Sequence, residues 1–136
     1  MAESDPELAE LLRQLGPVRN QGTFAFCRLP EGEGLPESAV GWFREAEGAS
    51  VIVPTSVAAE KGWPADYVAA WITLSVNSAL AAVGLTAVVS GALAEEGISC
   101  NVVAAVRHDH LFVPADRADE TMRILTEMQQ GRSPLG

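Results

Sequence analysis

The chain has 136 residues, 48% of them hydrophobic, and a formal net charge of −9 from 18 acidic and 9 basic residues. That length fits one compact domain, or two half-size lobes that share a core. The acidic balance argues against nucleic acid and against an anionic membrane surface, since both need clustered Lys and Arg. No segment reaches the roughly 20 apolar residues of a membrane span. The acidic start MAESDPELAELL does not resemble a signal peptide, so we expect a soluble, cytoplasmic protein.

The first element expected is a short amphipathic helix. Asp5-Pro6 reads as an N-cap followed by proline at the first helical position. Apolar side chains then recur at helical spacing until Gly16-Pro17 stops the helix; they are Leu8, Leu11, Leu12 and Leu15. A strand is predicted over residues 23–28 (TFAFCR), which are aromatic and β-compatible.

After the loop PEGEGLPES, the sequence predicts a helix, a strand and a short helix. Pro36 can open the first helix and Gly48 can end it, with Ala39, Val40, Phe43 and Ala46 roughly on one face. The apolar run ASVIV, residues 49–53, has the length of a strand. Residues 55–61 then form a short helix that Thr55 can cap and Gly62 stops.

The second half opens with an alternating strand, WITLSV, at residues 71–76. The clearest helix follows and ends at Gly97; its apolar positions are Leu85, Val88, Val89, Ala92 and Leu93. Residues 100–106 (CNVVAAV) predict a strand covered on both faces. A tight turn at residues 107–110 leads to a strand at residues 111–113. Asp116 then caps a last helix with the apolar stripe Ala118, Met122, Leu125 and Met128.

The element order predicts an α/β (α+β) fold: a ferredoxin-like βαββα unit with a mainly antiparallel sheet and helices on one face. This unit lacks its closing strand, which must come from the N-terminal β-α-β half or from another subunit. We expect an N-terminal helix at 1–19, an N-terminal half at 20–66, a main unit at 67–131 and a tail at 132–136. The two halves are not expected to be independent domains.

The run from Trp71 to Pro114 resembles an ACT domain, most of all the small stand-alone bacterial ACT-like proteins of unknown function. The segments TFAFCRLPEG and WFREAEGASVIVP resemble the N-terminal ACT-like half of those proteins. The likeness covers roughly residues 8–130. It implies a regulatory module that commonly binds amino acids, and it implies a homodimer.

The resemblance also implies where a ligand would bind: the loop after the first strand, the start of the first helix and the turn into the second strand. Those positions fall on Asn77, Ser78, Val83, Gly84, Leu85, Thr86, Ser99, Cys100, Asn101 and Val102. Asn77 and Val83-Gly84 stand where many amino-acid-binding members carry an acidic residue and a Pro-Gly pair. From the residues alone, the helix that starts near Leu85 can offer unpaired N–H groups to a carboxylate. The structural alternative is that Gly84 only makes the turn and Thr86 caps the helix.

The sequence gives weaker support for a metal site or a reactive cysteine than for the ligand site. His108 and His110 with Cys100 invite a metal reading, but a zinc site needs three or four converging ligands, and a polar hairpin explains the histidines better. Cys27 and Cys100 lie among apolar neighbours in predicted strands, so we expect both to be reduced and mostly buried. Among the three tryptophans, Trp71 shares a strand face with Thr73 and Ser75, which favours it for an interface.

The sequence therefore predicts a non-enzymatic sensing module without a cofactor, binding a small molecule such as an amino acid at the loop before Leu85. The alternative is a ligand-free dimerisation or protein-interaction module. A third hypothesis, an enzyme that uses Cys100 or the two histidines, has no motif to support it.

Overall fold

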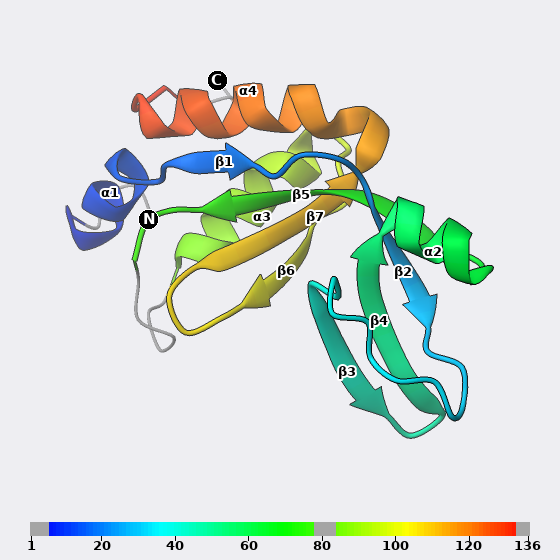
Figure 1. Ribbon diagram of the computed structural model, residues 1–136. Helices are drawn as coiled ribbons and strands as arrows, with labels where there is room; N and C mark the ends of the chain where they lie inside the picture. The colour runs from blue at the N-terminus through cyan, green and yellow to red at the C-terminus, as the bar shows by residue number, and fades with distance from the viewer. Residues whose placement is uncertain (1–5, 78–83, 133–136) are drawn as a thin grey trace. The chain divides into compact units, whose positions relative to one another are not determined.

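The structure is a computed structural model that describes residues 6–77 and 84–132. The chain divides into two compact units. We call Gln21–Ala70 the inserted unit, and Met1–Asn20 together with Trp71–Gly136 the outer unit. In Figure 1 the inserted unit carries strands β2 to β4 and helix α2, and the outer unit carries the remaining helices.

The inserted unit is a small antiparallel sheet with one helix. Its strands lie in the order β5-β2-β4-β3, and the three pairs β5/β2, β2/β4 and β4/β3 are all antiparallel. The elements are β2 (Phe24–Arg28), β3 (Gly41–Glu45), β4 (Gly48–Pro54), α2 (Thr55–Lys61) and the first half of β5 (Tyr67–Leu74). Gly62 ends α2 with φ +72°, the left-handed conformation expected of a glycine C-cap.

The core of the inserted unit lies between one sheet face and α2. The buried side chains are Ala25, Cys27, Val51, Val53, Ala58 and Trp63, with Leu29, Ala39 and Val57 packed against them. The residues that alternate with them along β2 and β4 point to the opposite face.

The helix expected between Pro36 and Gly48 is wrong. Residues 41–45 form strand β3, which makes a hairpin with β4, with Phe43 opposite Ser50. The spacing of Ala39, Val40, Phe43 and Ala46 suited a helical face, but Phe43 is 73% exposed in the strand. Pairing with β4 outweighs a local pattern in so short a segment, because a helix of this length is marginal without tertiary packing.

The outer unit combines the two ends of the chain. Its strands lie in the order β1-β5-β7-β6, with β1 antiparallel to the second half of β5. The elements are α1 (Pro6–Arg13), β1 (Pro17–Arg19), α3 (Leu85–Glu95), β6 (Asn101–Ala104), β7 (Asp109–Pro114), the short 3₁₀ helix η2 (Ala115–Arg117) and α4 (Ala118–Gln129).

Strand β1 supplies the closing strand that the βαββα unit lacks. Strand β1 is only three residues long and begins at Pro17. This strand was not predicted from the sequence, because Gly16-Pro17 was assigned to the end of the first helix. The strands of the two units lie in the same spatial order. In each unit the closing strand lies beside the first of the other three strands, and the third and then the second of these follow, numbered as they occur in the chain. Strand β5 closes the inserted unit and is the first strand of the outer unit.

One face of the outer sheet packs against helices. Alternate residues of β5 and β7 are fully buried, as are the inner positions of α3 and α4; they are Ile72, Leu74, Leu111, Val113, Val89, Leu93, Ile124 and Leu125. The predicted stripe of α3 is confirmed, with Val88 half-buried beside it. No helix within residues 6–77 and 84–132 is long and apolar enough to cross a membrane.

Three local predictions are corrected. The strand expected at residues 100–106 is the shorter β6, and Val103 is 46% exposed, because β6 is an edge strand rather than a covered one. Asp116 does not cap the last helix: it lies in η2, and Arg117 is the N-cap residue of α4. The turn closes earlier than expected, since the Ala105 N–H donates to the His108 carbonyl, and His110 belongs to β7.

Candidate functional site

The start of α3 is the centre of the predicted ligand site. Gly84 is its N-cap residue, with φ 106° and ψ −30°, and makes no side-chain hydrogen bond to the helix. Its carbonyl accepts the Val88 N–H at 2.9 Å. Leu85 is buried and Thr86 is exposed. Thr86 lies inside the first turn, so the structural alternative in which Thr86 caps the helix is wrong. The first-turn N–H groups therefore lack a capping side chain from the N-cap residue.

Leu8 of α1 packs against this position. A side chain added at Gly84 would meet the Leu8 Cδ2 atom at 3.4 Å, and the φ of Gly84 lies in the region that favours glycine. One side of the Gly84 backbone is thus covered by an apolar side chain from the N-terminal helix. Thr86, two residues further along the first turn, is exposed.

The structure does not gather all the predicted site residues. Ser78 and Val83 lie outside the described residues, and Asn77 is exposed. Ser99, Cys100, Asn101 and Val102 follow the C-terminal end of α3, whereas Gly84 precedes its N-terminal end. The 11 residues of α3 separate these groups by roughly 16 Å at 1.5 Å per residue. Asn101 begins β6 opposite Phe112.

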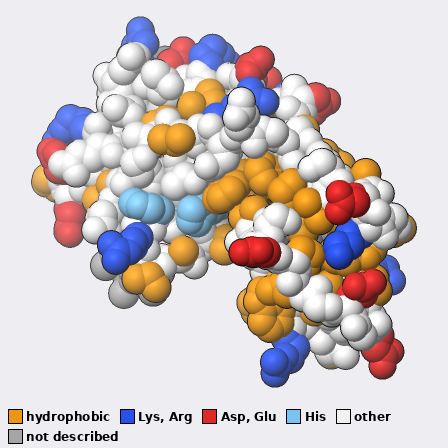
Figure 2. Space-filling model, in the orientation of Figure 1, with side chains coloured by type: hydrophobic (Ala, Val, Ile, Leu, Met, Phe, Trp, Pro, Cys, Tyr) orange, Lys and Arg blue, Asp and Glu red, His pale blue; other side chains and the backbone are white. Residues whose placement is uncertain are grey.

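A polar cluster on the other face of the outer sheet was not foreseen. The Trp71 Nε1–H donates to His110 Nδ1 at 3.0 Å, and the Thr73 hydroxyl contacts the same nitrogen at 3.1 Å. The Asn20 amide donates to the Thr73 Oγ1 atom at 3.0 Å. Figure 2 shows the histidine side chains (pale blue) together at the surface. The sequence indicated this cluster in one respect: the alternation of side chains along the strand predicted that Trp71 and Thr73 share a face.

Donation from Trp71 makes Nδ1 of His110 an acceptor, so neutral His110 carries its proton on Nε2. Burial lowers the pKa of His110; His108 lowers it further and Asp109 opposes the shift. His110 thus favours its neutral form, as a fixed structural acceptor. Within the described part of the chain, no group of three or more His, Cys, Asp or Glu side chains could hold a metal ion.

The cysteines are free, and their surroundings do not favour a nucleophile. Cys27 is buried as predicted, but Cys100 is only partly buried, because it lies just before the exposed edge strand β6. Burial raises the pKa of the Cys100 thiol to about 11. Burial, with a smaller effect of Asp66, also raises the pKa of Cys27. A thiol with a raised pKa is protonated at neutral pH and therefore a poor nucleophile.

The inserted unit has a surface hollow of about 570 Å³ between the end of β2 and the β3–β4 hairpin. Its rim carries Arg28, Glu45 and Asp66. The Arg28 Nε atom lies 3.8 Å from the Asp66 carboxylate, and both side chains are largely exposed. Exposed pairs of this kind contribute little to stability or binding, so this hollow makes a weaker candidate than the start of α3.

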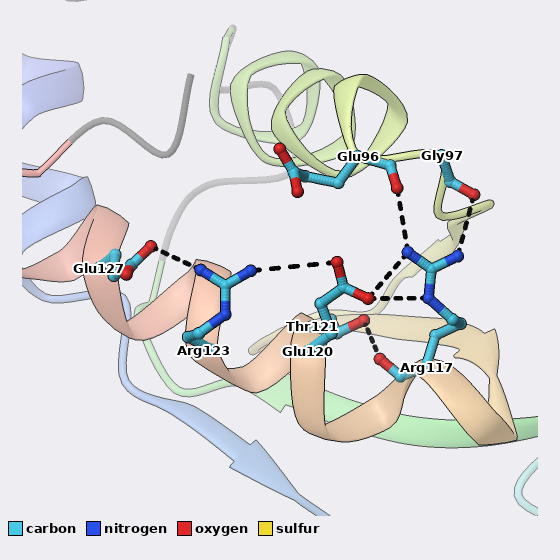
Figure 3. A network of polar contacts seen from close by, with 7 residues as sticks. All are labelled: Glu96, Gly97, Arg117, Glu120, Thr121, Arg123 and Glu127. Atoms are coloured by element: carbon cyan, nitrogen blue, oxygen red, sulfur yellow. Dashed lines mark hydrogen bonds and ion pairs between the residues drawn. The ribbon is translucent and has the colours of Figure 1, made fainter. Parts of the chain in front are cut away.

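A second polar network connects α3 with α4 and is structural. Arg117 donates to the carbonyls of Glu96, at 3.0 Å, and Gly97, at 3.5 Å, and pairs with Glu120. Figure 3 shows that the network continues through Arg123 to Glu127. The guanidinium satisfies carbonyls at the end of α3 that the helix itself leaves unpaired.

Two family models match the sequence, and both are described as ACT domain. One matches residues 4–70 and the other residues 67–127. The matches overlap only at the start of β5, the strand that both sheets share. Among curated proteins, none matches the sequence significantly.

Solved structures agree with this assignment. A Vibrio cholerae protein of unknown function, VC0802, described as a possible transport protein, is 34% identical over 90% of this chain and 96% of its own, with a TM-score of 0.78. Atu0741 from Agrobacterium tumefaciens is 22% identical, covers 88% and 91% of the two chains and has a TM-score of 0.60. The ligand-free regulatory subunit of aspartate kinase from Thermus thermophilus shares the fold at 12% identity, with coverage of 83% and 95% and a TM-score of 0.59.

Proposed function

Because the chain belongs to the ACT domain family, we propose that it is a regulatory protein without catalytic activity that binds a small molecule, with an amino acid as the first candidate. The proposed site is the N-terminal end of α3, with Gly84, Leu85 and Thr86, and includes Asn77, Ser78 and Val83, which precede this helix in the sequence. Its fold is that of aspartate kinase regulatory subunits, which supports a regulatory role.

The observation that carries this proposal is the glycine at the N-cap of α3. Gly84 offers no side-chain acceptor to the first turn, whereas Ser, Thr, Asp and Asn, the preferred N-cap residues, would supply one. The N–H groups of the first turn and the positive end of the helix dipole favour a bound carboxylate. An amino acid would supply that carboxylate. Ser99, Cys100, Asn101 and Val102, at the other end of α3, are not needed for this contact.

The test is a thermal-shift screen of the full chain against the protein amino acids, followed by calorimetry on each hit. A ligand at 100 times its Kd should stabilise the native state by about 2.7 kcal/mol. Gly84→Val would be a poor variant, because the φ of 106° at this position strains any side chain.

Thr86→Glu is a sharper variant, with Thr86→Gln as its matched control. Thr86 is exposed in the first turn of α3, so both substitutions fit the fold, and a glutamate there is favourable for the helix itself. The glutamate should repel the ligand carboxylate and weaken binding by tenfold or more, whereas the isosteric glutamine should change the affinity little. Equal affinities of the two variants would place the site elsewhere. A screen without any hit would leave the interaction module as the better hypothesis.

A further inference from the structure

The hollow between the end of β2 and the β3–β4 hairpin has the size of a site for an organic molecule. Its volume of about 570 Å³ lies within the roughly 300–1,000 Å³ that is usual for small-molecule pockets. A single metal ion would leave most of this space empty. The lining includes the apolar residues Phe26, Leu29 and Pro30, so part of a ligand can leave water there.

The charged residues of the hollow favour a cation. The lining holds three carboxylates, from Glu45, Glu47 and Asp66, and one guanidinium, from Arg28, which gives it a net charge of −2. Figure 2 shows acidic side chains (red) near hydrophobic ones (orange) at the surface where Figure 1 places β2 to β4. A site of this charge attracts cations and repels carboxylates and phosphates.

The guanidinium of Arg28 does not neutralise the site. Its Nε atom lies 3.8 Å from the Asp66 carboxylate, and both side chains are largely exposed. Because exposed pairs of this kind contribute little free energy, a ligand cation can replace the guanidinium beside Asp66 at low cost.

The carboxylates hold separate positions around the hollow. Glu45 accepts a hydrogen bond from the Ser50 hydroxyl across the β3–β4 hairpin. The Asp66 N–H donates to the Phe26 carbonyl at 2.8 Å, which fixes Asp66 beside β2. Among the residues that the structure describes, no three His, Cys, Asp or Glu side chains converge closely enough to hold a metal ion. Separated carboxylates suit a ligand with several charges along a chain, whereas a compact ion needs oxygens that converge.

A buried oxygen without a donor lies close to Phe26. The Tyr67 ring packs edge-on against the Phe26 ring, with the centroids 5.4 Å apart. The Tyr67 Oη atom is buried and has no hydrogen-bond partner in the described part of the chain. A hydrogen-bond donor beside Phe26 is therefore favoured, and an ammonium group carries three donors.

We propose that this hollow binds an aliphatic polyamine, a cation with ammonium groups spaced along an apolar carbon chain. The ammonium groups pair with Glu45, Glu47 and Asp66, and the methylene groups between them lie against the apolar residues of the lining. This site is separate from the start of α3 and has the opposite preference, because the start of α3 is proposed to take a carboxylate.

The first experiment is a calorimetric titration of the full chain with spermidine at about 0.15 M salt, which screens exposed charges beyond about 8 Å. The wild type should bind one spermidine per chain. The double variant Glu47→Gln/Asp66→Asn should bind it at least fivefold more weakly, because two ammonium groups lose their partners. Glu45 is left unchanged, since it also accepts the Ser50 hydroxyl.

The matched control is Glu37→Gln/Glu60→Gln. It removes the same charge from two exposed residues of the inserted unit that do not line the hollow, and should change the affinity less than twofold. All four positions are exposed, so neither double variant should affect folding, which thermal unfolding will verify. Absence of saturable binding would overturn the proposal. So would equal weakening in both variants, because spermidine would then respond only to the net charge of −9.

The second experiment tests the apolar contact with diaminopropane, diaminobutane, diaminopentane and diaminohexane, each with an amino group at both ends. Each added methylene should raise the affinity, by up to about fourfold where it is fully buried. Attraction between charges alone would not increase as the ammonium groups move apart. An affinity that stays level or falls along the series, or Mg²⁺ that competes as well as the diamines, would refute a polyamine site. Neither experiment depends on the ligand site at α3.

Discussion

Arg117 is the side chain that joins the end of α3 to the start of α4. Its guanidinium donates to two carbonyls at the end of α3 and pairs with the Glu120 carboxylate at 2.8 Å. The fork of an arginine can make these contacts together, whereas a lysine offers one compact charge. Arg123, in the same network, is 53% exposed and pairs with the carboxylates of Glu120 and Glu127.

We expect Arg117→Ala to lower the free energy of unfolding by about 1–2 kcal/mol, because two carbonyls and a glutamate lose their partner. Arg117→Lys should recover less than half of that loss. The matched control, Arg123→Ala, should cost less than about 0.5 kcal/mol, as exposed ion pairs contribute little. Urea unfolding of the three variants measures these differences. An equal loss for Arg117→Ala and Arg123→Ala would show that the carbonyl contacts do not matter.

His110 is a second residue with a testable effect, since its protonation makes the stability of the protein depend on pH. Its pKa is lowered by burial first and by His108 second, and Asp109 acts against both. The unfolded chain therefore takes up the proton more readily than the folded one. The stability contributed by neutral His110 is present above its ordinary pKa of about 6.5. It is lost as the pH falls through that value towards the folded-state pKa.

An NMR titration of the His110 ring should show this shift and its causes. In the wild type we expect the pKa to lie below about 6.5. His108→Gln should raise it towards the ordinary value, and Asp109→Asn should lower it further. If both substitutions moved the pKa in the same direction, the electrostatic explanation would be wrong. Loss of the Trp71 donor in Trp71→Phe should raise the pKa through greater solvation.

At the scale of elements, α1 is an integral part of the outer unit. Leu8 is 3% exposed and packs beside Gly84, and Leu15, after the helix, is fully buried. The chain then enters β1, whose Arg19 pairs with Asp119 of α4 at 2.8 Å. The Gly16 N–H donates to the Gln129 side chain at 2.9 Å, so the N-terminal segment is fastened to α4 as well.

Leu8→Ala should therefore destabilise the protein by about 2–4 kcal/mol, through lost burial and the cavity left beside Gly84. Leu35→Ala is the control, since Leu35 is 44% exposed in the loop before β3 and should lose less than about 0.5 kcal/mol. Chemical denaturation of both variants measures these changes in the free energy of unfolding. A small effect at Leu8 would mean that α1 docks loosely and that the start of α3 is more open than its packing indicates.

At the scale of the whole molecule, the two units have cores of different size. The buried cluster of the inserted unit contains several small side chains, such as Ala25, Cys27 and Ala58. The outer unit buries mostly large aliphatic side chains on β5, β7, α3 and α4. Because opening energy follows buried apolar contact, the two units should not be equally protected.

We expect native-state hydrogen exchange to be faster in β3 and β4 than in β7 and α4. The inserted unit should open at a lower free energy than the global unfolding of the chain. Exchange measured by mass spectrometry under mild denaturant distinguishes the units. Identical opening energies would indicate that the chain unfolds as one cooperative body despite its two cores.

The sequence by itself determined most of what depends on neighbours along the chain. Helices α1 and α3 follow from leucine or aliphatic spacing and from glycine stops at Gly16 and Gly97. Helix α2 follows from its glycine stop at Gly62, although Pro54 and not Thr55 is its N-cap residue. The ACT resemblance was also visible, and the family models confirm it. Gly84 was identified as the start of α3, because glycine and the apolar period of the helix both point there.

Only the tertiary structure decided what depends on distant residues. Strand β1 forms because it meets β5, and β3 forms because it meets β4, although the local pattern favoured a helix. The exposure of β6, the Leu8 side chain beside Gly84 and the pairing of Trp71 with His110 likewise depend on segments far apart in the chain. Capping and helical periodicity act within a few residues, whereas strand pairing and burial depend on which segments meet, and spacing along the sequence does not encode that.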